Sequence, residues 1–513
     1  MNSTTQAFAS AQSFESIFRT LAYGLVALVV VTQLQRWFNQ RNYLRDVPSP
    51  GGASWIWGHE KQVWEATIGA QYTQWFDKLQ THVMKIRGAF QKPDILVLAD
   101  PQAITYIMQK RVYDWPHSEI VRPRIARLLG KSLGWVEGES EHKRMRHLVA
   151  PSLSPEAIKN GAQQIFSASD DLANSLEQHI TANNGFAKIS IIDWANQGTI
   201  NVIGRFGFGH DFDGGTSDDA KKIMGAWRKM AIMGISPRGF VALMLLRRFP
   251  ILNSLPLKAL KAQGDVRLTI HSGIAKELLR RNRDLTSDGN DLLSRLLGAH
   301  ESGKISTEEL MDHISMFIMA GSETTSQTLG YAVWELAKNP HYQARLREEV
   351  MSFSSSPSYE ELQTKMPFMD AFTRETLRMH PAAPYMERVA SVDDVLPLRY
   401  PIIRKDGTTV NEIHTKAGQT VIIPVFSINR DSGVWGDGNE FRPDRWLEPL
   451  PPLDNLTKAL FQFKAILFTL VRRFEWSDTG VQIKNKVTSS IQPLVIGEEE
   501  KGPQLPVGVK ILQ

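Results

Sequence analysis

Apolar residues recur at helical spacing through most of the chain. In four long stretches every third or fourth position is apolar, which is the pattern of amphipathic helices packed against a core. These stretches are residues 155–180, 193–206, 265–280 and 306–338. The body of the protein is therefore predicted to be mostly helical.

Two shorter stretches have the composition of buried strands. Residues 94–100 and 418–431 are apolar runs, and the second is rich in β-branched residues. Charged residues and glycine in 281–291 predict a solvent-exposed loop. We predict one large, mainly α domain with a small β portion (α+β) over residues 44–513.

The first 43 residues have a pattern of their own. A strongly apolar core at 21–31 extends with its neighbours into a marginal membrane span over about 17–35. Arg36 and Arg41 follow it, and such positive charge marks the cytoplasmic side of a span. We predict a single-pass transmembrane anchor with the main domain in the cytoplasm and Asn2, in a glycosylation sequon, in the lumen. A signal peptide or an interfacial helix is the alternative.

Composition narrows the chemistry. The chain of 513 residues contains no cysteine, which excludes disulfides, zinc–cysteine sites, iron–sulfur clusters and thiol catalysis. Its net charge of +5 is too dilute to indicate nucleic acid, but it suits a protein beside an anionic membrane surface.

A polar cluster interrupts the apolar stretch 306–338. Glycine and hydroxyl residues there predict a helix that is bent or locally opened. Glu323 and Thr324 are candidates for relaying protons to a molecule bound against the helix. The alternative is a close helix crossing at Gly321 with the hydroxyl groups bonded internally.

Charged residues form three further candidate groups. Glu375 and Arg378 share a helix face, as a partly buried pair or as a surface ion pair. Arg388 lies in an extended stretch after two prolines, where it can face an anion. His142 and Arg146 lie one turn apart, as a site or as a solvated basic face.

These motifs, taken in order, resemble a fungal-type, membrane-anchored cytochrome P-450, a haem-thiolate monooxygenase. "AGSETTS" at 320–326 is similar to the family's oxygen-activating helix, "ETLR" to its Glu-x-x-Arg motif, and "FRPDRW" to the segment whose arginine completes a Glu–Arg–Arg network. The stretch 193–213 is similar to a helix and turn of fungal members. A helical solenoid or another all-α fold explains the helix content but not this order of motifs.

The resemblance implies a role for each matching residue. Glu323 and Thr324 would deliver protons to iron-bound oxygen, and Ala320 and Gly321 would contact the haem. The haem propionates would be bound by Arg146, Arg388 and His142, although the family more often has tryptophan at the last position. The structural network would consist of Glu375, Arg378 and Arg445.

The resemblance also implies a reaction. A family member hydroxylates or epoxidises an apolar small molecule with oxygen and electrons from a membrane-bound NADPH-dependent reductase, at the endoplasmic reticulum and often in fungal secondary metabolism. The substrate class that the apolar stretches 116–130 and 230–245 would accept stays open among terpenoid, fatty-acyl, steroid and aromatic molecules.

One part of the family pattern is missing. The loop Phe-x-x-Gly-x-Arg-x-Cys-x-Gly, whose cysteine binds the iron, should precede a helix that resembles 461–476. Helical spacing of apolar residues continues back to Leu456, and the connection between Trp446 and Lys464 is about 20 residues shorter than the thiolate site needs. No histidine or methionine follows Arg430 to replace the ligand, and Lys458 is predicted to be an ordinary solvated lysine.

Three hypotheses follow from the missing loop. The first is a monooxygenase lineage whose chain has lost an exon-sized piece, leaving it impaired or inactive. The second is a haem-free, membrane-anchored pseudoenzyme with a binding or scaffolding role. The third is a haem protein of other chemistry with a different ligand.

Overall fold

The computed structural model describes residues 24, 44–281, 291–404, 407–449 and 461–512. The described chain divides into two compact units. The smaller unit consists of residues 44–60, Leu79–Trp115 and Val389–Val421, and the larger one of Lys61–Lys78, Pro116–Arg388 and the chain from Ile422 onward. The prediction of one domain over 44–513 stays a prediction.

The smaller unit is built on two antiparallel strand pairs. Strand β1 (Val83–Ile86) pairs with β2 (Ile95–Leu98), whose four side chains are all buried. Strand β5 (Asp394–Ile403) pairs with β6 (Thr409–Thr415) through a register shift between Pro397 and Ile402. Asp100 caps the helix α4 (Pro101–Thr105) by accepting hydrogen bonds from two backbone N–H groups of its first turn.

The larger unit is mainly helical. Its principal helices are α3 (Ala70–Leu79), α5 (Val121–Leu129), α6 (Glu139–Val149), α7 (Pro155–Asn160), α8 (Ala162–Ala182), α9 (Ile191–Phe208), α10 (Asp218–Ile235), α11 (Pro237–Arg248), α13 (Asp265–Ile270), α14 (Lys276–Arg281), α15 (Leu292–Glu301), α16 (Thr307–Lys338), α17 (Pro340–Met351), α18 (Tyr359–Thr364), α19 (Pro367–Met379) and α22 (Phe461–Arg473). The shorter helices are α2 (Glu60–Glu65), α12 (Lys258–Ala262), α20 (Val425–Ile428) and α21 (Ser432–Trp435).

Two small antiparallel sheets complete the larger unit. One has the order β3–β11–β8, with β11 (Pro506–Ile511) between β3 (Phe186–Ser190) and β8 (Phe474–Asp478). The other is the hairpin of β9 (Ile483–Val487) and β10 (Ile491–Val495), in which Ile491 pairs with Val487. Strands β4 (Met386–Val389) and β7 (Thr420–Ile423) each cross the sequence boundary between the two units.

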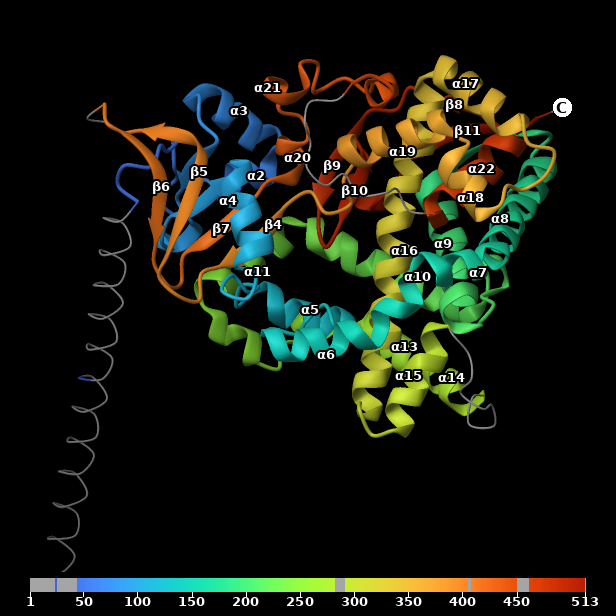
Figure 1. The fold of residues 1–513 in the computed structure, drawn as a ribbon, viewed down its shortest axis with the longest axis horizontal. Helices are drawn as coiled ribbons and strands as arrows, with labels where there is room; N and C mark the ends of the chain where they lie inside the picture. Colours follow the sequence, from blue (N-terminus) through green and yellow to red (C-terminus); the bar gives the residue numbers. More distant parts are fainter. Residues whose placement is uncertain (1–23, 25–43, 282–290, 405–406, 450–460, 513) are drawn as a thin grey trace, which may run out of the picture. The chain divides into compact units, whose positions relative to one another are not determined.

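The long helix α16 organises the larger unit, and Figure 1 shows it running through that unit beside α9. Ser306 and Glu309 form a capping box at its start, an arrangement whose loss costs about 1 kcal/mol. The helix crosses α9 closely, because a Cβ atom at Gly330 would lie 2.4 Å from the Ile192 side chain. Glycine is therefore a packing requirement at this crossing.

Helix α16 also joins two hydrophobic clusters. Its C-terminal half packs with α8, α9, α19 and α22, where Leu172, Leu336 and Leu467 are fully buried. Its N-terminal half packs with α10, α13 and α15, where Ile270 and Leu296 are fully buried. The position of the cluster 320–326 is thus fixed by packing on both sides.

The predicted mainly α fold with a small β portion is confirmed. Helix α16 matches the predicted stretch 306–338, and β2 lies within the predicted strand 94–100. The segment 282–290, which includes most of the predicted loop, lies outside the described residues, as does the predicted anchor at 17–35 apart from Gly24.

Four predicted boundaries are wrong. The stretch 155–180 breaks at Gly161, where a Cβ atom would lie 2.4 Å from the Phe206 ring. The stretch 265–280 contains a π-helical turn, and the strand predicted at 418–431 ends at Ile423, because Pro424 is the N-cap of α20. The helix predicted at 461–476 ends at Arg473, because the next residues pair with β11 as β8.

No single helix among the described residues has the length and apolar composition needed to cross a membrane. Helices α10 and α11 are joined at a bend of 77°, and only together do they have the length and apolar composition of a membrane span.

Candidate active site

The cluster 320–326 lies in an uninterrupted α-helix, so the prediction of a locally opened helix is wrong. Three of its hydroxyl groups bond a carbonyl of the preceding turn: Ser322 bonds Ile318 (2.6 Å), Thr324 bonds Ala320 (2.8 Å) and Ser326 bonds Glu323 (2.9 Å). A Cβ atom at Gly321 would lie 2.9 Å from Ile203 of α9. The close crossing and the internally bonded hydroxyls of the alternative interpretation are therefore both present.

Glu323 lies buried on one side of α16. Its Oε1 accepts hydrogen bonds from Ser490 (2.5 Å) and Ser489 (3.2 Å), which form the turn of the β9–β10 hairpin. Burial raises the pKa of Glu323 to about 7, although the two serine hydrogen bonds and the charge of Arg124 lower it. The carboxyl group therefore titrates near neutral pH.

Thr324 and Ala320 lie on a different face of the same helix and are exposed. The Thr324 hydroxyl is engaged with the Ala320 carbonyl, while the carboxyl of Glu323 is engaged with the hairpin. The two residues that the resemblance pairs for proton delivery thus have separate partners in this structure.

The Glu-x-x-Arg motif is fully buried. Two parallel hydrogen bonds of 2.8 and 2.9 Å join Arg378 to Glu375, and Arg445 adds a third at 3.1 Å to the same carboxylate. The side chains of Glu375, Arg378 and Arg445 are 0%, 2% and 3% exposed, which rules out the surface ion pair. Burial alone would raise the pKa of Glu375, but the bonds from Arg378 and its other partners outweigh it and lower the pKa.

Other groups satisfy the remaining donors of this network. Arg378 donates to the carbonyls of Asn429, Gly438 and Glu440, and Arg445 donates to Asp437 at 2.6 Å. A buried ion pair is stable only when such additional bonds are present. The network therefore holds the segment 429–445 against α19.

The candidate propionate residues have different surroundings. Arg146 is exposed on α6, and His142 is half-buried. Half-buried Arg388 donates to the carbonyl of Glu387 at 3.0 Å and interacts electrostatically with Glu137. Glu137 also accepts hydrogen bonds from the backbone N–H and the ring of His117, at 2.9 and 2.7 Å. Burial lowers the pKa of Arg388, and the attraction of Glu137 offsets this effect only in part.

The donor set does not fit a thiolate-bound haem. The chain has no cysteine, and no group of three or more His, Asp or Glu side chains in the described part of the chain could hold a metal ion. The shortened connection 450–460 lies outside the described residues, and its sequence contains no cysteine, histidine or methionine. No residue of the chain can supply the axial thiolate on which oxygen activation depends.

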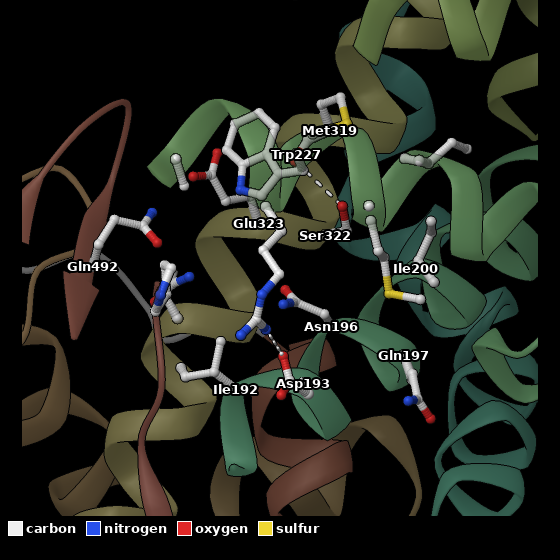
Figure 2. Close-up of a pocket in the computed structure, with 17 residues that line it drawn as sticks. Ile192, Asp193, Asn196, Gln197, Ile200, Trp227, Met319, Ser322, Glu323 and Gln492 are labelled. Carbon is white, nitrogen blue, oxygen red and sulfur yellow. Dashed lines mark hydrogen bonds and ion pairs between the residues drawn. The ribbon is translucent and has the colours of Figure 1, made fainter. Parts of the chain in front are cut away.

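A cavity of about 220 Å³ lies beside Glu323. Figure 2 shows it among side chains of α9, α10, α16 and the segment around Gln492. Its apolar wall includes Ile200, Met319 and Trp227, while Thr324 and Ala320 do not belong to its lining. The cavity therefore borders the Glu323 side of α16.

Sequence reasoning missed several of these residues. Arg124, Glu137 and the serines of the hairpin turn meet their partners through contacts between distant segments, and no local pattern marks them. The only sequence signal for a role of Trp227 was the apolar character of the residues that follow it.

Comparisons with known proteins agree on one family. A model described as cytochrome P450 matches residues 48–451. "Cytochrome P450 monooxygenase claQ" of Ampulloclitocybe clavipes is 30% identical over 533 residues, covering 95% of this chain and 97% of the relative. "Cytochrome P450 monooxygenase claP" of the same fungus is 30% identical over 531 residues, with the same coverage. "Cytochrome P450 monooxygenase 205" of Postia placenta is 28% identical over 532 residues, covering 94% and 95%.

Proposed function

The chain belongs to the cytochrome P450 family, and from that premise we propose that, with its present sequence, it does not activate oxygen. The observation that carries the proposal is the absence of cysteine from all 513 residues. The family implies a haem cofactor, and the axial thiolate supplies the electron density that favours O–O cleavage. A chain without a thiolate lacks this chemistry even if haem enters the fold.

The extents of the claQ alignment and of the family match support the proposal that a segment is missing from this chain. The comparison with claQ extends over 533 positions, more than the 513 residues of the chain, so that relative has residues with no counterpart here. The family match also ends at residue 451, inside the shortened connection between Trp446 and Lys464.

The lineage reaction is proposed from the family. Its members generally use a reductase partner and hydrophobic substrates, and we propose hydroxylation or epoxidation of an apolar small molecule as the ancestral reaction. Glu323, Thr324, Glu375 and Arg378 are all retained. Their retention favours a recent loss of the loop, because a long-inactive chain would have accumulated changes at these positions.

A second candidate function is a haem-free binding protein. Two observations favour it: Arg388 donates a hydrogen bond to the carbonyl of Glu387, and the β9–β10 hairpin supplies hydrogen bonds to Glu323. Groups that the family would turn toward haem or oxygen thus have partners within the chain. The cavity beside Glu323 gives this candidate a place to bind a ligand.

Haem content tests the main proposal. The full chain and a variant with a loop of the family pattern Phe-x-x-Gly-x-Arg-x-Cys-x-Gly inserted between Trp446 and Phe461 are expressed together with a haem precursor, and bound haem per polypeptide is measured. We expect haem in the loop-inserted variant and little or none in the unmodified chain. Equal haem in both, with oxygen-dependent NADPH consumption by both, would refute the proposal.

The location of the protein is a separate proposal. The apolar run at 17–35 and the arginines after it support an anchor in the endoplasmic reticulum membrane, with the main domain in the cytoplasm. Alkaline extraction of membranes tests this: the full chain should stay in the pellet, and a variant lacking residues 1–43 should be released. Release of both would contradict the anchor.

A further inference from the structure

Helix α11 and the turn after it expose a group of large apolar side chains. Of the twenty such side chains that are exposed in the described part of the chain, six lie between residues 241 and 257. They are 36% to 76% exposed and are called the apolar patch: Val241, Leu245, Phe249, Ile251, Leu255 and Leu257. Single exposed apolar residues are ordinary, but a group of this kind indicates a surface that binds a partner.

The orientation of α11 is fixed by its other face, so the exposure belongs to a packed helix. Phe240 stacks on the Trp64 ring with the ring centroids 4.9 Å apart, and Met244 is buried. Val241 and Leu245 lie one turn apart and are exposed. The helix therefore carries apolar side chains both on the face that packs against the protein and on the face that is exposed.

The charge of this region favours an anionic partner. The chain has no aspartate or glutamate between residues 220 and 264. Four basic side chains close in sequence to the apolar patch are exposed: Arg238, Arg248, Lys258 and Lys261. Apolar side chains accompanied by Lys and Arg are the composition of surfaces that bind at the interface of an anionic membrane.

The dimensions of α11 exclude a membrane span. Its 12 residues extend over about 18 Å, less than the roughly 30 Å of a bilayer core. Helix α10 does not lengthen it into a span, because α10 packs Ile223, Trp227 and Met230 into the hydrophobic cluster that contains Ile270. A membrane contact of α11 is therefore one along the membrane surface.

From these observations we propose that the apolar patch docks the folded protein on the surface of an anionic membrane. The inference rests on the proposed location of the chain, and it names the surface that meets the lipid. In that location residues 36–43 follow the anchor and reach at most about 29 Å when fully extended. Residue 44 therefore stays near the bilayer, and anionic lipid is the partner that the anchor brings to the patch.

A single fluorescent label tests the docking, because a chain without cysteine accepts one label at a chosen position. Leu245→Cys places an environment-sensitive fluorophore on the apolar patch, and Phe249→Cys is a second variant in case the first does not fold. The full chain is reconstituted in vesicles of phosphatidylcholine and phosphatidylserine, and quenching by nitroxide-labelled lipids is measured. We expect this quenching to be about threefold stronger at residue 245 than at a control position, because the patch lies at the acyl boundary.

Met351→Cys is the matched control, because Met351 is also a large apolar side chain, 57% exposed on α17 and outside the apolar patch. Its label should be quenched by aqueous iodide and little by the nitroxide lipids. The double substitution Lys258→Glu and Lys261→Glu should reduce lipid quenching at residue 245, since each lysine near an anionic surface strengthens binding about fivefold. Vesicles of phosphatidylcholine alone should have the same effect.

Three results would overturn the proposal. One is iodide quenching at residue 245 as strong as at residue 351, and another is equal lipid quenching at the two positions. The third is protection of residue 245 from iodide without lipid quenching, which would show that a second copy of the chain covers the patch.

Alkaline extraction of the same vesicles separates this inference from the proposed anchor. A chain that stays in the pellet while its label at residue 245 remains in water refutes the docking and leaves the anchor standing. A chain that is released, although its label was quenched by lipid before extraction, supports the docking and contradicts the anchor.

Discussion

Burial and hydrogen bonding have opposite effects on the pKa of Glu323. Burial raises its pKa from 4.5 to about 7, although two serine hydroxyls and Arg124 act in the opposite direction. A carboxyl group whose pKa is higher in the folded state takes up a proton on folding. Its contribution to stability is therefore present at low pH and is lost as the pH rises from about 4.5 through about 7.

This titration predicts a pH-dependent difference between the wild-type chain and Glu323→Gln. Between pH 4.5 and 8, the free energy of unfolding of the wild type should fall relative to that of the variant by roughly 2–3 kcal/mol. Urea unfolding of both proteins at several pH values measures the difference. Parallel pH curves for the two proteins would contradict the raised pKa.

The buried arginine network predicts a large effect from one substitution. Arg445→Met removes a cation that is 3% exposed and leaves Glu375 with fewer partners, so we expect a loss of about 3–5 kcal/mol in the free energy of unfolding. The matched control is Lys143→Met, because the pair of Lys143 with Glu139 is 58% and 59% exposed. That substitution should cost less than about 1 kcal/mol. Similar losses in denaturant unfolding would refute the distinction between the two pairs.

Among elements, α16 and α9 cross closely beside the candidate site. Gly330→Leu would force a side chain against Ile192, where even a Cβ atom would lie at 2.4 Å. Overpacking of this kind should lower the free energy of unfolding by about 1–3 kcal/mol. Gly298→Leu on α15 is the control, because a Cβ atom there meets nothing within 4 Å, and it should change stability by less than about 1 kcal/mol. Thermal unfolding of both variants is the measurement, and equal destabilisation would contradict the close crossing.

The elements also show what local sequence can predict. Helix α16 could be predicted because its capping box and its apolar spacing agree. The packing at the break could not, because the Phe206 ring that leaves no room for a Cβ atom at Gly161 comes from a distant part of the sequence. Likewise, the motif Glu375–Arg378 identified the buried network, but the serines that bond Glu323 come from another segment that carries no local signal.

The whole molecule has the fold of its family, but it lacks the cysteine thiolate on which the family's oxygen activation depends. A ligand that binds only the folded state stabilises it by RT ln(1 + [L]/Kd). We therefore expect the melting temperature of the unmodified chain to be the same with and without added haem, while the variant with the inserted cysteine loop melts at a higher temperature with haem. Differential scanning fluorimetry of both proteins checks this, and a haem-dependent rise in the unmodified chain would contradict it.

The most direct test of the central claim is the absorption spectrum of the reduced, carbon-monoxide-bound protein. The full chain, reconstituted with haem, should show no red-shifted Soret band of the thiolate type, whereas the variant with the inserted cysteine loop should show one. A thiolate-type band from the unmodified, cysteine-free chain, or a histidine-type band accompanied by substrate oxidation, would contradict the proposal that this chain does not activate oxygen.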